Sequence, residues 1–127
     1  MRVYGAVALA FFVTLGAGWL WGHSGRSEMQ TALHAATERA GVAEARGLVL
    51  EGRVSLFQMN FGEAAQKFGQ AVTAVERLQT QLRDARQTDR ATRLDPALTA
   101  LREAQRLTLA LDQGAHNKAA DALKALN

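Results

Sequence analysis

The chain has 127 residues, which is enough for one small domain or for one domain and a membrane anchor. It contains no cysteine, which excludes disulfides, zinc–thiolate sites and a cysteine nucleophile. One proline and 6% aromatic residues favour an all-α protein, and a formal net charge of +3 is too small to indicate a nucleic-acid binder.

The first predicted element is an apolar helix over residues 3–21, a run of 19 residues without a charge. At 1.5 Å per residue it is about 28 Å long, close to the roughly 30 Å hydrocarbon core of a bilayer. Tyr4 stands near one end, and Trp19 and Trp21 stand near the other, where aromatic rings favour the membrane interface. We therefore predict a single transmembrane anchor over residues 1–22, in contact with the lipid bilayer. Cleavage as a signal peptide is the alternative.

Small residues recur at every fourth position of this run, and a ridge of this kind lets a second helix approach closely. The ridge consists of Ala6, Ala10, Thr14 and Gly18. We expect it to pack against another membrane protein subunit. A short amino-terminal region before a long apolar run favours a cytoplasmic amino terminus. The Ala- and Arg-rich composition indicates a bacterium, so we expect the inner (cytoplasmic) membrane, with residues 23–127 in the periplasm.

Four further helices are predicted behind a short linker over residues 23–26. Ser27 and Gln30 form a capping-box pattern, which marks a helix start. Asp95-Pro96 marks another start, with Asp as the N-cap and Pro at the first helical position. Between these signals, apolar residues recur at helical spacing. They predict one extramembrane domain over residues 27–127, with helices over residues 27–59, 62–87, 95–112 and 115–126.

Six residues between positions 45 and 76 have the order and spacing of a recurring helical hairpin. In that pattern a Gly lets the paired helices approach, and small and aromatic residues interlock beside it. The six are Gly52, Leu56, Phe61, Ala64, Phe68 and Ala71. The segment therefore resembles a tetratricopeptide-repeat hairpin, and residues 103–126 form a weaker echo of it. The resemblance implies a protein-interaction scaffold, and a closed four-helix bundle is the alternative arrangement.

Four arginines follow this hairpin at spacings of three, four and three residues: Arg83, Arg86, Arg90 and Arg93. If the helix persists, they share one face and form a candidate contact for an acidic partner protein. A solvated helix face is the alternative. Two aspartates interleave with the arginines and no aromatic residue is present to stack on a base, so we predict no nucleic-acid partner.

The sequence contains no residue set typical of catalysis. His34 and Glu38 lie one turn apart, but no further ligand joins them at metal-binding spacing. A nucleophile with its base, a Gly-rich phosphate loop and paired carboxylates cannot be assembled. We therefore expect no enzymatic activity, cofactor or metal.

Together these features predict a non-enzymatic accessory or scaffolding subunit of a larger bacterial membrane complex. It would bind its protein partners through the transmembrane helix and the helical domain. Two alternatives stay open. One is a signal-cleaved, soluble periplasmic adaptor or cargo-binding module, and the other is an envelope protein that self-associates as a homodimer.

Overall fold

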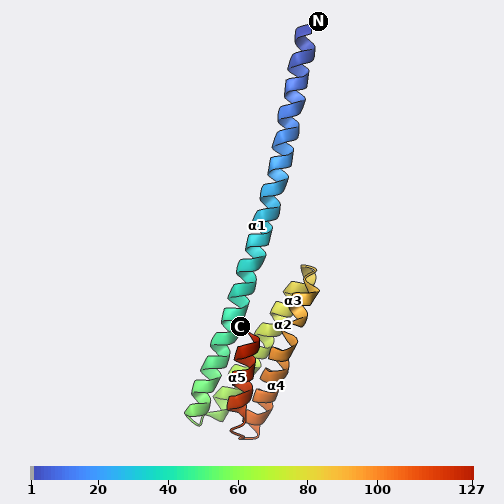
Figure 1. Ribbon diagram of the computed structural model, residues 1–127. Coiled ribbons are helices and arrows are strands. Elements are labelled where there is room, and N and C mark those ends of the chain that lie inside the picture. Colours follow the sequence, from blue (N-terminus) through green and yellow to red (C-terminus); the bar gives the residue numbers. More distant parts are fainter. Residues whose placement is uncertain (1) are drawn as a thin grey trace. The chain divides into compact units, whose positions relative to one another are not determined.

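The computed structural model describes the backbone of residues 2–127 and the side chains of residues 26–127. The predicted all-α class is confirmed, since this part of the chain forms helices and contains no strand (Figure 1). The helices are α1 (Arg2–Phe57), α2 (Phe61–Asp84), α3 (Thr88–Thr92), α4 (Asp95–Leu109) and α5 (Ala115–Ala125). The chain divides into two compact units, Met1–Thr37 and Glu38–Asn127.

The linker predicted over residues 23–26 is absent, because α1 is continuous from Arg2 to Phe57. The helix start predicted at Ser27 is therefore wrong. The carbonyl oxygen of Ser27 accepts a hydrogen bond from Thr31 Oγ1 at 2.9 Å, within the helix. The glycines around the predicted linker cost a helix about 1 kcal/mol each relative to Ala, which weakens the helix without ending it.

In the first unit, the side chains of residues 26–37 are largely exposed, including Met29 and Leu33. Within residues 26–127, no helical stretch is long and apolar enough to cross a membrane. The apolar run over residues 3–21 lies outside the residues whose side chains are described. The predicted interface and ridge residues lie there with it: Tyr4, Ala6, Ala10, Thr14, Gly18, Trp19 and Trp21.

In the second unit, α2 packs against α3 and α4, and α4 packs against α5. The largest fully buried apolar side chains are Phe68, Leu101, Val49 and Val75, and small alanines fill most of the remaining core. Because alanine adds little bulk, the helices of the unit can approach one another closely. This close packing leaves room in the core for one large aromatic ring, that of Phe68.

The turn expected between the predicted helices over residues 27–59 and 62–87 is present, with α1 ending at Phe57 and α2 beginning at Phe61. Asn60 caps α2 by a reciprocal pair of bonds. Its Oδ1 accepts from the backbone N–H of Glu63 at 3.2 Å, and its Nδ2 donates to Glu63 Oε2 at 2.8 Å. This exchange satisfies a backbone donor that the first turn of a helix leaves free, which fixes where α2 starts.

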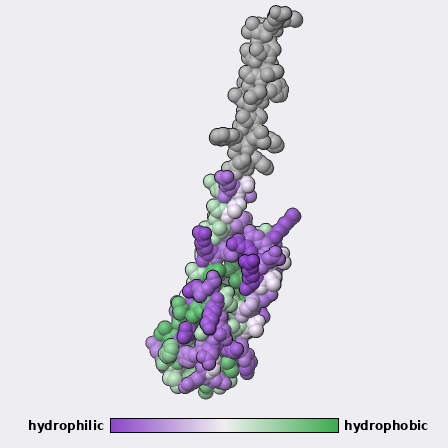
Figure 2. Space-filling view, in the orientation of Figure 1, coloured by the Kyte–Doolittle hydropathy of each residue, from purple (hydrophilic) through white to green (hydrophobic). Residues whose placement is uncertain are grey.

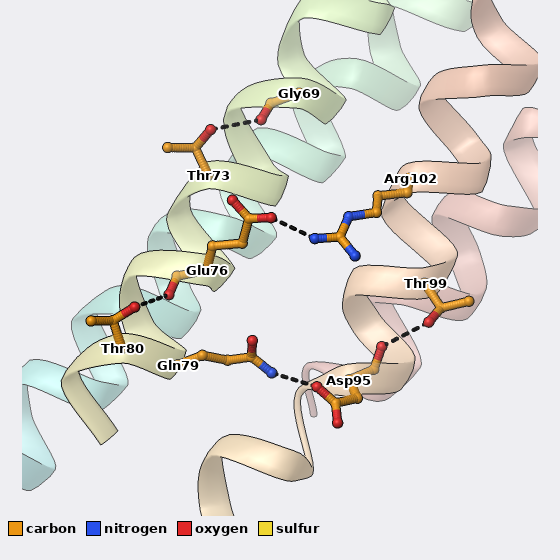
Figure 3. Close-up of polar contacts among 8 residues, drawn as sticks. All are labelled: Gly69, Thr73, Glu76, Gln79, Thr80, Asp95, Thr99 and Arg102. Carbon is orange, nitrogen blue, oxygen red and sulfur yellow. Dashed lines mark hydrogen bonds and ion pairs between the residues drawn. The ribbon is translucent and has the colours of Figure 1, made fainter. Parts of the chain in front are cut away.

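The second half of the chain departs from prediction in two places. The helix predicted over residues 62–87 ends at Asp84, and the short α3 follows it. α4 begins at Asp95, so Leu94 and not Asp95 is the N-cap residue. The Asp95 carboxylate instead accepts a hydrogen bond from Gln79 Nε2 at 2.7 Å (Figure 3). The Asp95 side chain, which the sequence predicts to cap the helix, therefore makes a tertiary contact instead.

Gln79 connects three helices from a buried position on α2. Its Nε2 donates to the backbone oxygen of Ala91 in α3 at 2.9 Å, as well as to Asp95 at the start of α4. Nearby on the same face, Arg102 of α4 pairs with Glu76 of α2 at 2.5 Å (Figure 3). The polar contacts of Gln79 hold the α3–α4 connection against α2.

We expect Gln79→Leu to lower the free energy of unfolding by about 1–3 kcal/mol, because it removes the donor from buried acceptors. Thermal unfolding of the full chain in mild detergent, followed by circular dichroism, measures the change. Gln81→Leu is the matched control: Gln81 is exposed on the same helix, and we expect a change within about 0.5 kcal/mol. Equal effects of the two changes would contradict this role of Gln79.

Candidate protein-interaction surface

The residues that carry the hairpin resemblance gather where α1 meets α2. Gly52, Leu56, Ala64, Phe68 and Ala71 are buried there, and Phe61 is half-buried. A Cβ atom added to Gly52 would lie only 2.7 Å from Cε1 of Phe68. The two helices approach closely at this point because residue 52 has no side chain.

Beyond this contact, the second unit exposes six large apolar side chains. They are Leu50, Val54, Phe57, Met59, Leu109 and Leu111, each between 48% and 70% exposed. Three of them lie along α1, and Met59 and Leu111 follow the carboxyl ends of α1 and α4. Figure 2 shows apolar surface at the end of the unit where the α1–α2 turn lies, among polar side chains. Exposed apolar groups gathered in one region are typical of protein-interaction sites.

Met59 and Leu111 share an unusual backbone conformation. Their φ angles are 60° and 57°, in the left-handed region that glycine adopts most easily. Each directly precedes a residue whose N–H closes the preceding helix: Asn60 donates to the Ser55 oxygen at 2.8 Å, and Asp112 donates to the Leu107 oxygen at 2.8 Å. At both helix ends, a large exposed apolar side chain occupies a position at which glycine is the most stable residue.

A pocket of about 250 Å³ lies between the α1–α2 turn and the α4–α5 turn. Its lining residues are Leu56, Phe57, Met59, Phe61, Gln113 and His116. The Phe57 and His116 rings are in contact, with centroids 4.5 Å apart and planes tilted by 39°. We call the pocket, together with Met59 and Leu111, the apolar end of the unit. The pocket is lined mainly by apolar side chains, with Gln113 and His116 as the two polar ones. Such a lining suits a side chain of another protein as the ligand.

A second concavity of about 1000 Å³ lies along α4 and α5, and its charges are balanced. Arg106 donates to both carboxylate oxygens of Glu103, at 2.8 and 2.5 Å. These hydrogen bonds lower the pKa of the Glu103 carboxyl below its ordinary value. Lys118 lies 3.8 Å from Asp121, and Arg102 is paired with Glu76. Since its cations face acids of the same chain, this groove has no charge preference for a ligand.

The four arginines predicted to share a helix face do not lie on one helix. α2 ends at Asp84, and Arg86 has a φ of 59°, which turns the chain before α3 begins. Arg83, Arg86, Arg90 and Arg93 are all exposed. Arg90 is already paired with Glu38 of α1 at 2.9 Å. The expected row is therefore interrupted. The left-handed conformation of Arg86 separates α2 from α3, and no Gly or Pro in this segment marks that break in the sequence.

Within residues 26–127, no group of three or more His, Asp or Glu side chains is placed to hold a metal ion. Glu38, one half of the His34–Glu38 pair considered from the sequence, binds Arg90 instead.

The sequence alone did not lead us to predict the apolar end. Two apolar residues shortly after helix ends, Met59 and Leu111, could have indicated it.

In comparisons with known proteins, no family model, curated protein or solved structure matches this chain.

Proposed function

We propose that the chain is a non-enzymatic accessory or scaffolding subunit of a larger bacterial membrane protein complex. Residues 3–21 would cross the inner membrane once, and the second unit would lie in the periplasm. There the apolar end would bind another protein subunit. The concavity along α4 and α5, whose charges are balanced, would face solvent. The predicted ridge on the transmembrane helix would provide a second contact within the membrane.

One observation carries this proposal: Met59 and Leu111 expose large apolar side chains from left-handed conformations. Met59 lines the pocket, and Leu111 precedes by two residues Gln113, which also lines it. At each of these two positions, the left-handed conformation makes the chain less stable than a glycine would, by about 0.5–1 kcal/mol. Each also exposes apolar surface to water, which adds no stability to the free chain. Local strain combined with exposed apolar surface favours a role in binding.

The tetratricopeptide-like character of the unit is part of the same proposal. It is supported by the close approach of Gly52 to the Phe68 ring, which is the contact that the motif requires. Hairpins of this family need stacked neighbours to bury a continuous apolar face. A partner subunit at the apolar end would supply such a neighbour.

The experiment is to extract the full-length chain from its own membranes in mild detergent and to determine the native mass and protein composition of what it migrates with. We expect a large complex of fixed composition. Replacing both Met59 and Leu111 with Gly should remove the chain from that complex. The same two substitutions should stabilise the free chain, because they relieve the left-handed strain.

Arg86→Gly is the matched control for this experiment. Arg86 has a φ of 59° in the turn after α2, at the other end of that helix from the apolar end. The change should stabilise the chain and leave the complex intact. Normal association of the Met59→Gly/Leu111→Gly variant would refute the apolar end as the binding site. Migration alone or as a simple dimer would refute the accessory-subunit proposal, and a mature protein beginning near Trp19 would support the periplasmic adaptor instead.

A further inference from the structure

In the second unit, α1 carries two apolar faces. One contains Ala45, Val49 and Leu56 and is buried in the core. The other is a stripe of residues that face away from the core, at alternating spacings of three and four. The stripe consists of Ala40, Ala43, Gly47, Leu50, Val54 and Phe57. All are exposed except Gly47, which is half-buried.

This alternation is the seam of a coiled coil. A mean apolar spacing of 3.5 residues keeps one stripe facing a partner helix, whereas a helix that packs only into its own core needs no second stripe. In heptad notation, Ala40, Gly47 and Val54 are a positions, and Ala43, Leu50 and Phe57 are d positions. The same spacing continues upstream in the sequence at Met29, Leu33 and Ala36.

The charges beside the stripe identify its occupant. The g positions are Arg39, Arg46 and Arg53, and the e positions are Glu44 and Glu51. In a parallel, in-register pair, each g residue faces the e residue five positions later on the other helix. Arg39 then faces Glu44 of the second copy, and Arg46 faces Glu51 of the second copy. An antiparallel pair would place arginine against arginine and glutamate against glutamate.

Three of the flanking charges, Arg39, Glu44 and Glu51, are exposed. Arg46 is half-buried, and its Nη1 donates to Asn127 Oδ1. Glu51 binds Lys67 through Oε2 at 2.6 Å, and Glu44 lies 3.9 Å from Arg77. A carboxylate accepts several hydrogen bonds through its two oxygens, so each glutamate can accept a second cation.

We propose that a second copy of this chain occupies the stripe, forming a parallel, in-register two-helix coiled coil through residues 39–57 of α1. The interface goes beyond the proposed function and does not rest on it, because it uses the outer face of α1 and shares only Phe57 with the pocket.

Single cysteines test the direction and register of the pair, since the natural chain has none. The full-length chain is purified in mild detergent as the Ala43→Cys or the Leu50→Cys variant and treated with a mild oxidant. Both variants should form a disulfide-linked dimer in high yield. Gln70→Cys, exposed on α2, should not. Cross-linking at only one of positions 43 and 50 indicates an antiparallel pair and overturns the proposal, as does cross-linking at neither.

Association of the purified chain provides the second readout. Leu50→Glu should raise the dissociation constant of the dimer by about a hundredfold or more, because it places a charge in the seam. Leu109→Glu, at an exposed apolar residue of α4, should leave it unchanged. Sedimentation equilibrium in detergent over a range of concentrations measures both. A wild-type chain that is monomeric throughout, or equal effects of the two changes, overturns the proposal.

A charge exchange tests the predicted partners directly. Arg39→Glu should weaken the dimer by about five- to tenfold, because it opposes two glutamates across each symmetric contact. Adding Glu44→Arg should return the affinity to within about twofold of the wild type. Circular dichroism confirms that each variant is folded. If the double variant is as weak as Arg39→Glu alone, residue 39 does not face residue 44 and the register is wrong.

Discussion

Phe68→Ala is expected to lower the free energy of unfolding of the second unit by about 3–5 kcal/mol. Phe68 is fully buried on α2 and is the largest such side chain in the part of the chain with described side chains. Its ring lies against the backbone of Gly52 in α1. The neighbouring core is largely alanine, whose short side chains cannot move in to fill the cavity. A loss of this size is a large share of the total stability of a small domain.

The measurement is the thermal unfolding of the full chain in mild detergent, followed by circular dichroism at one fixed protein concentration. For a unit of this size, each kcal/mol corresponds to roughly 4–8 °C in Tm. Leu109→Ala serves as the control, since Leu109 is 69% exposed and its loss should cost less than about 0.5 kcal/mol. A loss below about 1 kcal/mol for Phe68→Ala would mean that α1 does not pack on this ring.

Two glycines of α1 are expected to respond in opposite directions to the same substitution. Gly52→Ala should lower the free energy of unfolding by about 1–3 kcal/mol. The added Cβ would lie 2.7 Å from the Phe68 ring, which is buried on all sides and cannot turn away. Gly47→Ala should raise it by about 0.5–1 kcal/mol, because a Cβ there meets nothing within 4 Å and alanine favours the helix.

Both glycine variants are measured in the same thermal assay, at a concentration low enough to keep the chain monomeric. A Gly52→Ala/Phe68→Leu double variant tests the cause of the effect. If the clash with the ring is responsible, the two substitutions together should cost clearly less than the sum of their separate effects. Two losses that simply add would show that Gly52 and Phe68 act independently, and equal responses of Gly47 and Gly52 would contradict the close approach.

The features predicted correctly from the sequence depend on neighbours along the chain. The all-α class follows from helical spacing and composition, and the α1–α2 turn follows from Asn60, whose side chain exchanges hydrogen bonds with Glu63 three residues later. The start of α4 at Asp95 likewise follows from the adjacent Pro96. These signals act within one turn of helix, so a short stretch of sequence contains them completely.

The predictions that failed depend on choices made elsewhere in the chain. The arginine row required a helix that persists beyond Asp84, whereas Arg86 adopts a left-handed conformation. The connection after it is held by Gln79, through contacts with Ala91 and Asp95 that are 12 and 16 residues distant. The helix start at Ser27 failed for a related reason, because a capping pattern starts a helix only when the preceding residues are not helical.

Two features of this protein follow from the sequence alone: its helical class and the position of the turn between α1 and α2. Packing between the helices decides which side of α1 is buried. A spacing pattern treats Gly47 and Gly52 alike, and it groups Leu50 and Val54 with the core. The close approach of Phe68 to Gly52 places α2 on one face of α1 and leaves the face of Leu50 and Val54 exposed. That choice depends on packing between helices, which local periodicity cannot specify.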